Sequence, residues 1–252
     1  MFIRIRKFRL ALTLTFLFTL TCASAFGQSF DQLLGSFAQG KSGVCVIYGH
    51  VLAVAEVDPV GVQDMVKSVY GGWAVVFPDH RRIYVDQEDI DKSLADKWSV
   101  GEPDNKLTIL SIALSMRSGG YKRETGMLDY GDVDWGKFMG SGQWTGYGET
   151  GGPNNTLAKG FERLIRETGP DGKVRLPATI GFGSLDEKSL PNYAAKAKEY
   201  KLVSEHDFSI AGYNAKTKCA VLRNPHNPKV VLEVPVSFLK KVPCGMDFLE
   251  KS

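Results

Sequence analysis

The segment QGKSGVC, residues 39–45, places a cysteine directly before a long apolar run that ends at Pro59. A thiol attacks as the thiolate, and the first turn of a helix offers unpaired amide hydrogens and a positive dipole end that stabilise this anion. If the apolar run is a helix, Cys45 stands at its first turn. Cys45 is therefore a candidate nucleophile, with a small buried core residue as the alternative.

A nucleophilic cysteine needs a base and a group that orients the base. His206 and Asn224 lie far downstream of Cys45 in that order, and an orienting Asn can accompany such a histidine. His206 opens one predicted strand and Asn224 ends the next, so pairing of the two strands would bring the side chains together. Singly, they could be an ordinary strand histidine and a turn residue. Their joint order and spacing favour a Cys-His-Asn triad.

Two other kinds of site compete for polar residues of the chain. Three possible metal ligands lie close together in the sequence on neighbouring predicted strands, namely His206, Cys219 and His226. They contain no tight ligand pair such as C-x-x-C or H-E-x-x-H, so no metal or other cofactor is predicted. Three carboxylates that neighbour aromatic residues could instead serve glycosidic chemistry, namely Asp129, Asp132 and Asp134. An acidic turn is the interpretation that we prefer for them.

The chain resembles the papain-like cysteine proteases, and among them the calpain type. Gln39 precedes Cys45 by six positions, as the oxyanion-hole glutamine of that family precedes its nucleophile. LVSEHDFSIAGY and LRNPHNP are similar to the family segments around the catalytic histidine and asparagine. The resemblance covers most of residues 30–250. It implies an endopeptidase in which Cys45, His206 and Asn224 form the triad and Gln39 donates to the oxyanion.

The resemblance departs from the family at two positions that usually hold tryptophan. Val46 follows the candidate nucleophile, and His226 stands where an indole shields the His-Asn hydrogen bond from water. These changes keep open an alternative function, a secreted protein with the protease fold that binds a peptide or glycan without turnover. Calcium dependence does not follow from the resemblance.

The predicted elements divide the chain into a helical and a sheet-forming part. Residues 44–58 and 107–118 have the apolar spacing of buried helices, and WAVVF and RIYV flank a turn as in a hairpin. After residue 156 a helix is followed by strands around the turns NAKTK and HNP. With the resemblance, this predicts an α+β, papain-like two-lobe fold: a helical lobe at about 26–125, a glycine-rich connection at about 126–155, and an antiparallel sheet lobe at about 156–252.

Residues 1–25 have a basic start, a short apolar core at 10–21 and a small-residue end, which is typical of a signal peptide. We therefore predict secretion or periplasmic export and no stable membrane insertion. Four of the 31 basic residues lie in this segment and no acidic residue does, so 27 basic and 28 acidic residues remain, a net charge of −1. This balance does not favour a nucleic-acid partner. The predicted partner is a peptide or protein substrate.

Three cysteines follow the predicted signal peptide, namely Cys45, Cys219 and Cys244. Export to an oxidising compartment would pair two of them. We predict a disulfide between Cys219 and Cys244, which would leave Cys45 free.

Overall fold

A computed structural model describes residues 29–129, 144–148 and 156–250. The helices are α2 (Phe30–Leu34), α3 (Cys45–Val57), α4 (Pro59–Met65), α5 (Gln87–Ala95), α6 (Lys106–Arg117), α7 (Leu157–Arg166), α8 (Ala194–Glu199) and α9 (Val236–Leu239). The strands are β1 (Ala38–Gln39), β2 (Val66–Val69), β3 (Gly72–Val76), β4 (Arg82–Asp86), β5 (Ser99–Val100), β6 (Trp144–Tyr147), β7 (Ala178–Phe182), β8 (His206–Asn214), β9 (Cys219–Arg223), β10 (Val231–Pro235) and β11 (Cys244–Leu249). The predicted signal peptide and most of the predicted glycine-rich connection lie outside the described residues.

The protein combines helices with antiparallel sheets, in agreement with the predicted α+β class. A six-stranded sheet has the order β10-β9-β8-β7-β11-β6. A three-stranded sheet, β2-β3-β4, contains the predicted hairpin, and β1 pairs with β5. Helices α3 and α6 occupy the two segments in which apolar spacing predicted buried helices.

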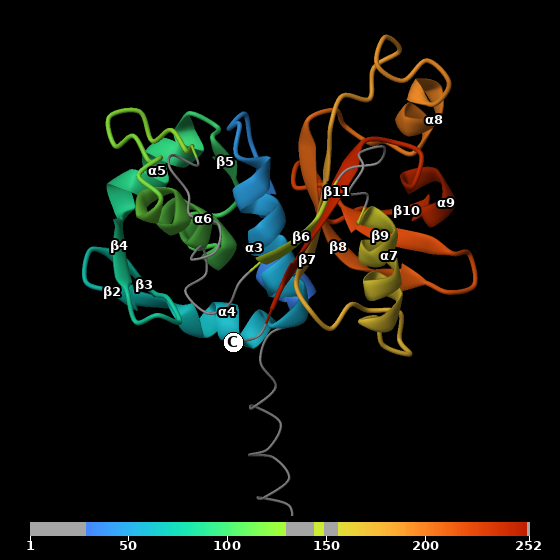
Figure 1. Ribbon diagram of the computed structural model, residues 1–252. Helices are drawn as coiled ribbons and strands as arrows, with labels where there is room; N and C mark the ends of the chain where they lie inside the picture. Colours follow the sequence, from blue (N-terminus) through green and yellow to red (C-terminus); the bar gives the residue numbers. More distant parts are fainter. Residues whose placement is uncertain (1–28, 130–143, 149–155, 251–252) are drawn as a thin grey trace, which may run out of the picture.

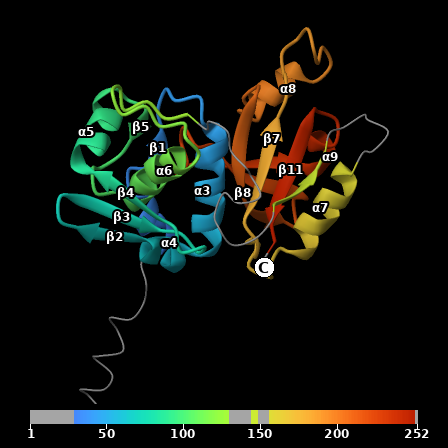
Figure 2. The same cartoon turned by 60° about the vertical axis from the view of Figure 1, so that its left-hand side comes forward.

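Helix α3 lies between the two halves of the molecule (Figures 1 and 2). One hydrophobic cluster is built from residues between Leu33 and Leu128, and a second from residues between Leu157 and Phe248. Most apolar residues of α3 belong to the first cluster, while Val57 packs against the second. Within the described part of the chain, no single helix is long and apolar enough to cross a membrane; α3 and α4 reach that length only as a pair bent by 117°.

The six-stranded sheet presents different surfaces to α3 and to α7, because side chains alternate along each strand. Phe208, Ile180 and Met246 belong to the second hydrophobic cluster, together with Leu157, Phe161 and Leu164 of α7; Figure 2 shows α7 beside this sheet. Asp207 points to the other side, where a Cβ atom added to Gly49 of α3 would lie 3.5 Å from the Asp207 Cβ atom. The first turns of α3 therefore pack closely on the start of β8.

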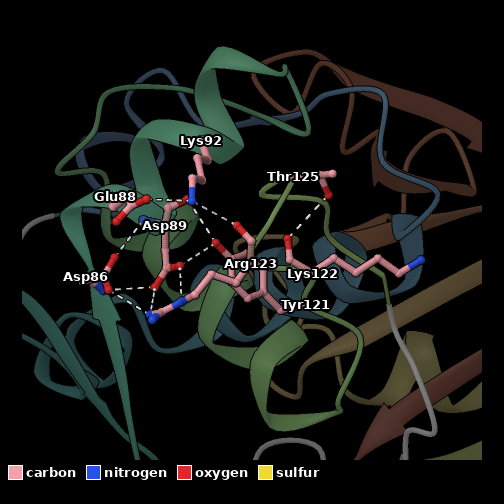
Figure 3. A network of polar contacts seen from close by, with 8 residues as sticks. All are labelled: Asp86, Glu88, Asp89, Lys92, Tyr121, Lys122, Arg123 and Thr125. Atoms are coloured by element: carbon pink, nitrogen blue, oxygen red, sulfur yellow. Dashed lines mark hydrogen bonds and ion pairs between the residues drawn. The ribbon is translucent and has the colours of Figure 1, made fainter.

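A polar network ties the segment after α6 to helix α5 (Figure 3). The Asp89 carboxylate, with only 1% of its side chain exposed, accepts hydrogen bonds from Tyr121 Oη at 2.7 Å and from Arg123 Nε at 3.0 Å. Arg123 also pairs with Asp86 at 2.8 Å. Burial opposes the charge of Asp89, but the bonds from Arg123 and Tyr121 hold its pKa below the usual value. The network fixes the return of the chain toward the glycine-rich connection.

The predicted disulfide between Cys219 and Cys244 is wrong, because both cysteines are free. Cys219 lies on β9 and Cys244 on β11, and β8 and β7 separate these strands. Three inter-strand spacings alone amount to about 14 Å, twice the Cα distance that a disulfide tolerates. Their sulfurs instead face the carbonyl oxygens of Thr217 and Leu239.

A thiol count tests this arrangement. A chain that begins at residue 26, unfolded without reductant, should show three reactive thiols by titration with a chromogenic disulfide. The same count should be obtained after reduction, because no cystine is present to open. A count of one before reduction and three after it would contradict the structure.

A buried ion pair joins the two halves beside the candidate site. Arg223, the last residue of β9, places Nε 2.8 Å from Glu56 Oε2 of α3, and their side chains are 12% and 7% exposed. Burial raises the pKa of Glu56 in spite of the Arg223 charge. Desolvation of the two charges therefore opposes formation of the pair, and removal of one partner should destabilise the fold more, because it leaves the other charge buried alone.

Replacement of Arg223 by alanine should destabilise the protein by about 3 kcal/mol at pH 7, since the Glu56 carboxylate is left buried without its partner. The folded-state pKa of Glu56 is already raised and would rise further, so the loss should shrink as the pH falls and Glu56 takes up a proton. Urea unfolding at pH 7 and pH 5 measures both effects. Lys67→Ala, which removes an exposed pair with Asp64, should change stability little. An equal loss at the two pH values would contradict this account.

Candidate functional site

Cys45 is the first residue of α3, as predicted. Burial raises the pKa of its thiol above the usual value, and the charge of Asp207 adds to this rise. The backbone amides of Asp207, Val46 and Cys45 itself act in the opposite direction but do not outweigh burial. The first turn of the helix thus favours a thiolate, while its surroundings favour the neutral thiol.

The side chain that meets the Cys45 sulfur is that of Asp207. Cys45 Sγ lies 4.0 Å from Asp207 Oδ2, within the range of a weak S–H hydrogen bond. Burial raises the pKa of Asp207 to about 6, and the nearby charge of Asp247 contributes. Among the described residues, no hydrogen bond joins Cys45 Sγ directly to the His206 ring. Sequence reasoning placed His206 opposite the thiol and missed Asp207.

His206 and Asn224 meet as predicted. His206 is the first residue of β8, Asn224 directly follows β9, and His206 Nε2 lies 3.0 Å from Asn224 Oδ1. The backbone N–H of His226 also donates to Asn224 Oδ1, at 3.0 Å. This second donor identifies the atom as the amide oxygen, so His206 Nε2 must donate to it. In the neutral ring, His206 Nδ1 then carries a lone pair that can accept a proton.

Burial makes the neutral form of His206 the stable one. The residue is 6% exposed, and its ring packs edge to face with Phe208 at 5.2 Å between centroids. Burial lowers the pKa of His206 to about 4, against the opposing effect of the Asn224 hydrogen bond. Because the pKa of Cys45 is raised as well, a neutral thiol and a neutral imidazole form the resting pair at pH 7. This differs from the thiolate–imidazolium pair that is familiar from cysteine nucleophiles.

Gln39 is attached to the loop that carries Asn224. Its backbone N–H donates to Pro225 O at 2.9 Å, and its carbonyl oxygen lies 3.2 Å from His226 Nδ1. Its side chain is 5% exposed and donates from Nε2 to Ser42 O at 2.6 Å. One hydrogen of the amide nitrogen is thereby used, and one remains for another acceptor. The buried Gln39 Oε1 has no partner among the described residues.

The structure joins the four predicted site residues into one set, in which Asp207 and His206 are linked only as neighbours on β8. The set runs from Cys45 through Asp207 to its neighbour His206, then to Asn224 and, across the loop after β9, to Gln39. Order and spacing predicted Cys45, His206 and Asn224 as site residues, and the family resemblance added Gln39. No sequence signal distinguished Asp207, since the side of β8 that faces α3 is set by packing.

The possible metal ligands do not come together. Cys219 pairs with Asn214, at the opposite end of β8 from His206, so the proposed metal ligands do not converge. Within the described residues, no group of three or more His, Cys, Asp or Glu side chains could hold a metal ion. Of the three carboxylates considered for glycosidic chemistry, Asp132 and Asp134 lie outside the described residues.

Comparison with known proteins adds no relative. No protein-family model matches the chain, and no curated protein matches it significantly.

Replacement of Asp207 by asparagine should make Cys45 more reactive, because it removes a negative charge 4.0 Å from the sulfur. If the thiol pKa falls by about one unit, alkylation by iodoacetamide at pH 7.5 should accelerate about threefold, since the larger thiolate fraction is partly offset by lower nucleophilicity. The gain should disappear below pH 6, where wild-type Asp207 takes up a proton. Mass spectrometry of the labelled peptide measures the rate at Cys45.

Asp247→Asn is the matched control for this prediction. It removes a carboxylate from the same side of the sheet that has no hydrogen bond to the sulfur among the described contacts. Its effect on Cys45 should be smaller than that of Asp207→Asn. A slower or unchanged reaction in Asp207→Asn at pH 7.5 would show that the carboxylate does not set the thiol pKa.

Proposed function

We propose that the chain is a papain-like, calpain-type cysteine endopeptidase that acts after export. In this proposal the two hydrophobic clusters are the two lobes of that fold, with α3 at their boundary. The observation that carries the proposal is the His206 Nε2 to Asn224 Oδ1 bond of 3.0 Å, on a strand whose next residue, Asp207, lies 4.0 Å from the sulfur of a cysteine at a helix N-terminus. A structural histidine and a turn asparagine have no need to meet next to a thiol.

The reaction would begin from the neutral resting pair. As Cys45 Sγ attacks the peptide carbonyl, its proton passes to His206 Nδ1, an S–C bond forms and the carbonyl π electrons move onto oxygen. His206 then protonates the leaving amine as the C–N bond breaks, which leaves a thioester. Water, deprotonated by His206, then attacks the thioester carbonyl. The S–C bond breaks, the acid is released, and His206 returns the proton to the Cys45 sulfur. Asn224 keeps His206 Nδ1 unprotonated at the start of each cycle.

The developing oxyanion would lie at the start of α3. The backbone N–H of Cys45 and the unused hydrogen of Gln39 Nε2 are the two donors in the proposal. The bond from Gln39 Nε2 to Ser42 O holds the amide on the loop that leads to Cys45. The loop after β9 thus holds the backbone of Gln39, and Ser42 of the following loop holds its side chain.

A second function is favoured by one observation, the contact of Cys45 with Asp207 in place of His206. A carboxylate at the sulfur opposes ionisation of the thiol, as suits a secreted protein that binds a peptide or glycan without turnover. A covalent peptide probe distinguishes the two functions, because a binding protein has no reason to activate the thiol.

An electrophilic peptide, such as a peptidyl chloromethyl ketone, should label Cys45 stoichiometrically if the protein is a peptidase. Cys45→Ala should abolish labelling and hydrolysis of fluorogenic peptides with little effect on folding. His206→Ala should lower hydrolysis by about 10²–10⁴-fold, the usual contribution of a general acid–base residue. Mass spectrometry and peptide-hydrolysis assays on the chain from residue 26 provide the measurements.

Cys219→Ala serves as the control, since this thiol lies at the far end of the sheet. It should leave both labelling and hydrolysis intact. Labelling at Cys45 that does not depend on His206, together with no hydrolysis of a diverse peptide library, would reject the peptidase and leave the binding protein.

A further inference from the structure

The ring of His226 lies flat on the ring of His206. The two centroids are 4.9 Å apart and the planes differ by 6°. His226 Nδ1 lies 3.2 Å from Gln39 O, and because a carbonyl oxygen only accepts, Nδ1 carries the proton of that bond. The ring is thus held between His206 of β8 and Gln39 of β1, and it covers an imidazole that is itself 6% exposed.

This arrangement replaces the missing indole with a group of different chemistry. The ring of His226 covers the His206–Asn224 bond where the family usually has an indole. Unlike an indole, an imidazole can take up a proton. A positive charge on His226 would stand 4.9 Å from the position where His206 becomes positive when it accepts the Cys45 proton. Two such charges repel each other, and the exposed position of His226 weakens the repulsion without abolishing it.

We propose that His226 is a positioning residue for His206: its ring shields the His206–Asn224 hydrogen bond from water, and its own protonation opposes proton transfer from Cys45 to His206. The inference rests on the proposed function, because it assigns to His206 the role of proton acceptor. It makes the site sensitive to acid through a residue that does not touch the substrate.

The groups around the ring pair support this assignment. Among the residues in described contact with His226, which come from β1, β8 and the loop after β9, His206 is the one with an ionisable side chain. The nearby carboxylate of Asp207 points toward α3, and Arg223 is engaged by Glu56. The charge of His226 acts to lower the pKa of His206, in the same direction as burial.

Two variants separate shielding from charge. His226→Phe keeps a flat ring but cannot be protonated, and His226→Ala removes the ring while keeping the backbone N–H that bonds to Asn224 Oδ1. His80→Asn, in the turn between β3 and β4, is the control for the loss of an unrelated histidine. Proton NMR of the His206 Nε2–H signal and an NMR titration of the His206 ring protons from pH 3 to 8 provide the readouts.

His226→Ala should lose the His206 Nε2–H signal through exchange with water, whereas His226→Phe should retain it. The NMR titration of the His206 ring should be shifted to higher pH in His226→Phe than in wild type by about half a pH unit, because no positive charge on residue 226 then opposes protonation of His206. His80→Asn should match wild type in both measurements. Circular dichroism confirms that each variant is folded.

The inference fails if His226→Ala keeps a protected Nε2–H signal, or if the pH profile of His226→Phe superimposes on that of wild type. A separate peptide-hydrolysis assay of the wild-type chain tests the proposed function. Altered NMR and pH profiles without hydrolysis would retain the coupling of the two rings and reject the peptidase. Hydrolysis with unchanged profiles would retain the peptidase and reject the role of His226.

Discussion

The close packing of α3 on the start of β8 is the constraint on which the site depends. Gly181, on the neighbouring strand β7, leaves the space that the Asp207 carboxylate fills, and a Cβ atom at this glycine would collide with Asp207 Oδ1. Gly49 of α3 packs against Asp207 from the other side, where an added Cβ atom would lie 3.5 Å from the Asp207 Cβ atom. Because α3 is also anchored in the N-terminal hydrophobic cluster, a group at its first turn is held from two directions. Such rigidity is what a nucleophile requires.

The same packing determines the charge state of the site. Burial disfavours the charged form of every ionisable group, so it raises the pKa of Cys45 and Asp207 and lowers that of His206. These shifts all oppose charge in the resting site. In the proposed reaction, charge would develop where the helix N-terminus and the Asn224 oxygen are already oriented toward it. A neutral thiol and a neutral imidazole are therefore the resting forms that this partly buried site favours.

Local sequence patterns predicted the elements that carry the site, and long-range packing decided what the patterns could not reveal. The apolar run after Cys45 and the turns around His206 and Asn224 specify a helix and a hairpin by short-range rules. Strand order has no such local signal. Strand β11 inserts between β7 and β6, which separates Cys244 from Cys219 and explains the failed disulfide prediction. Asp207 escaped notice for the same reason, since its neighbour α3 belongs to a distant part of the chain.

Residue 226 acts on the site through two chemically independent groups. Its backbone N–H donates to Asn224 Oδ1, and this fixes which atom Asn224 presents to His206 whatever side chain the residue carries. Its ring determines how much water and how much positive charge His206 meets. The backbone of the loop after β9 therefore fixes the orientation of Asn224 and His206. The side chain of residue 226 can then cover His206 with or without carrying a titratable group. In the proposed peptidase, a histidine at this position would make the site respond to pH without altering its geometry.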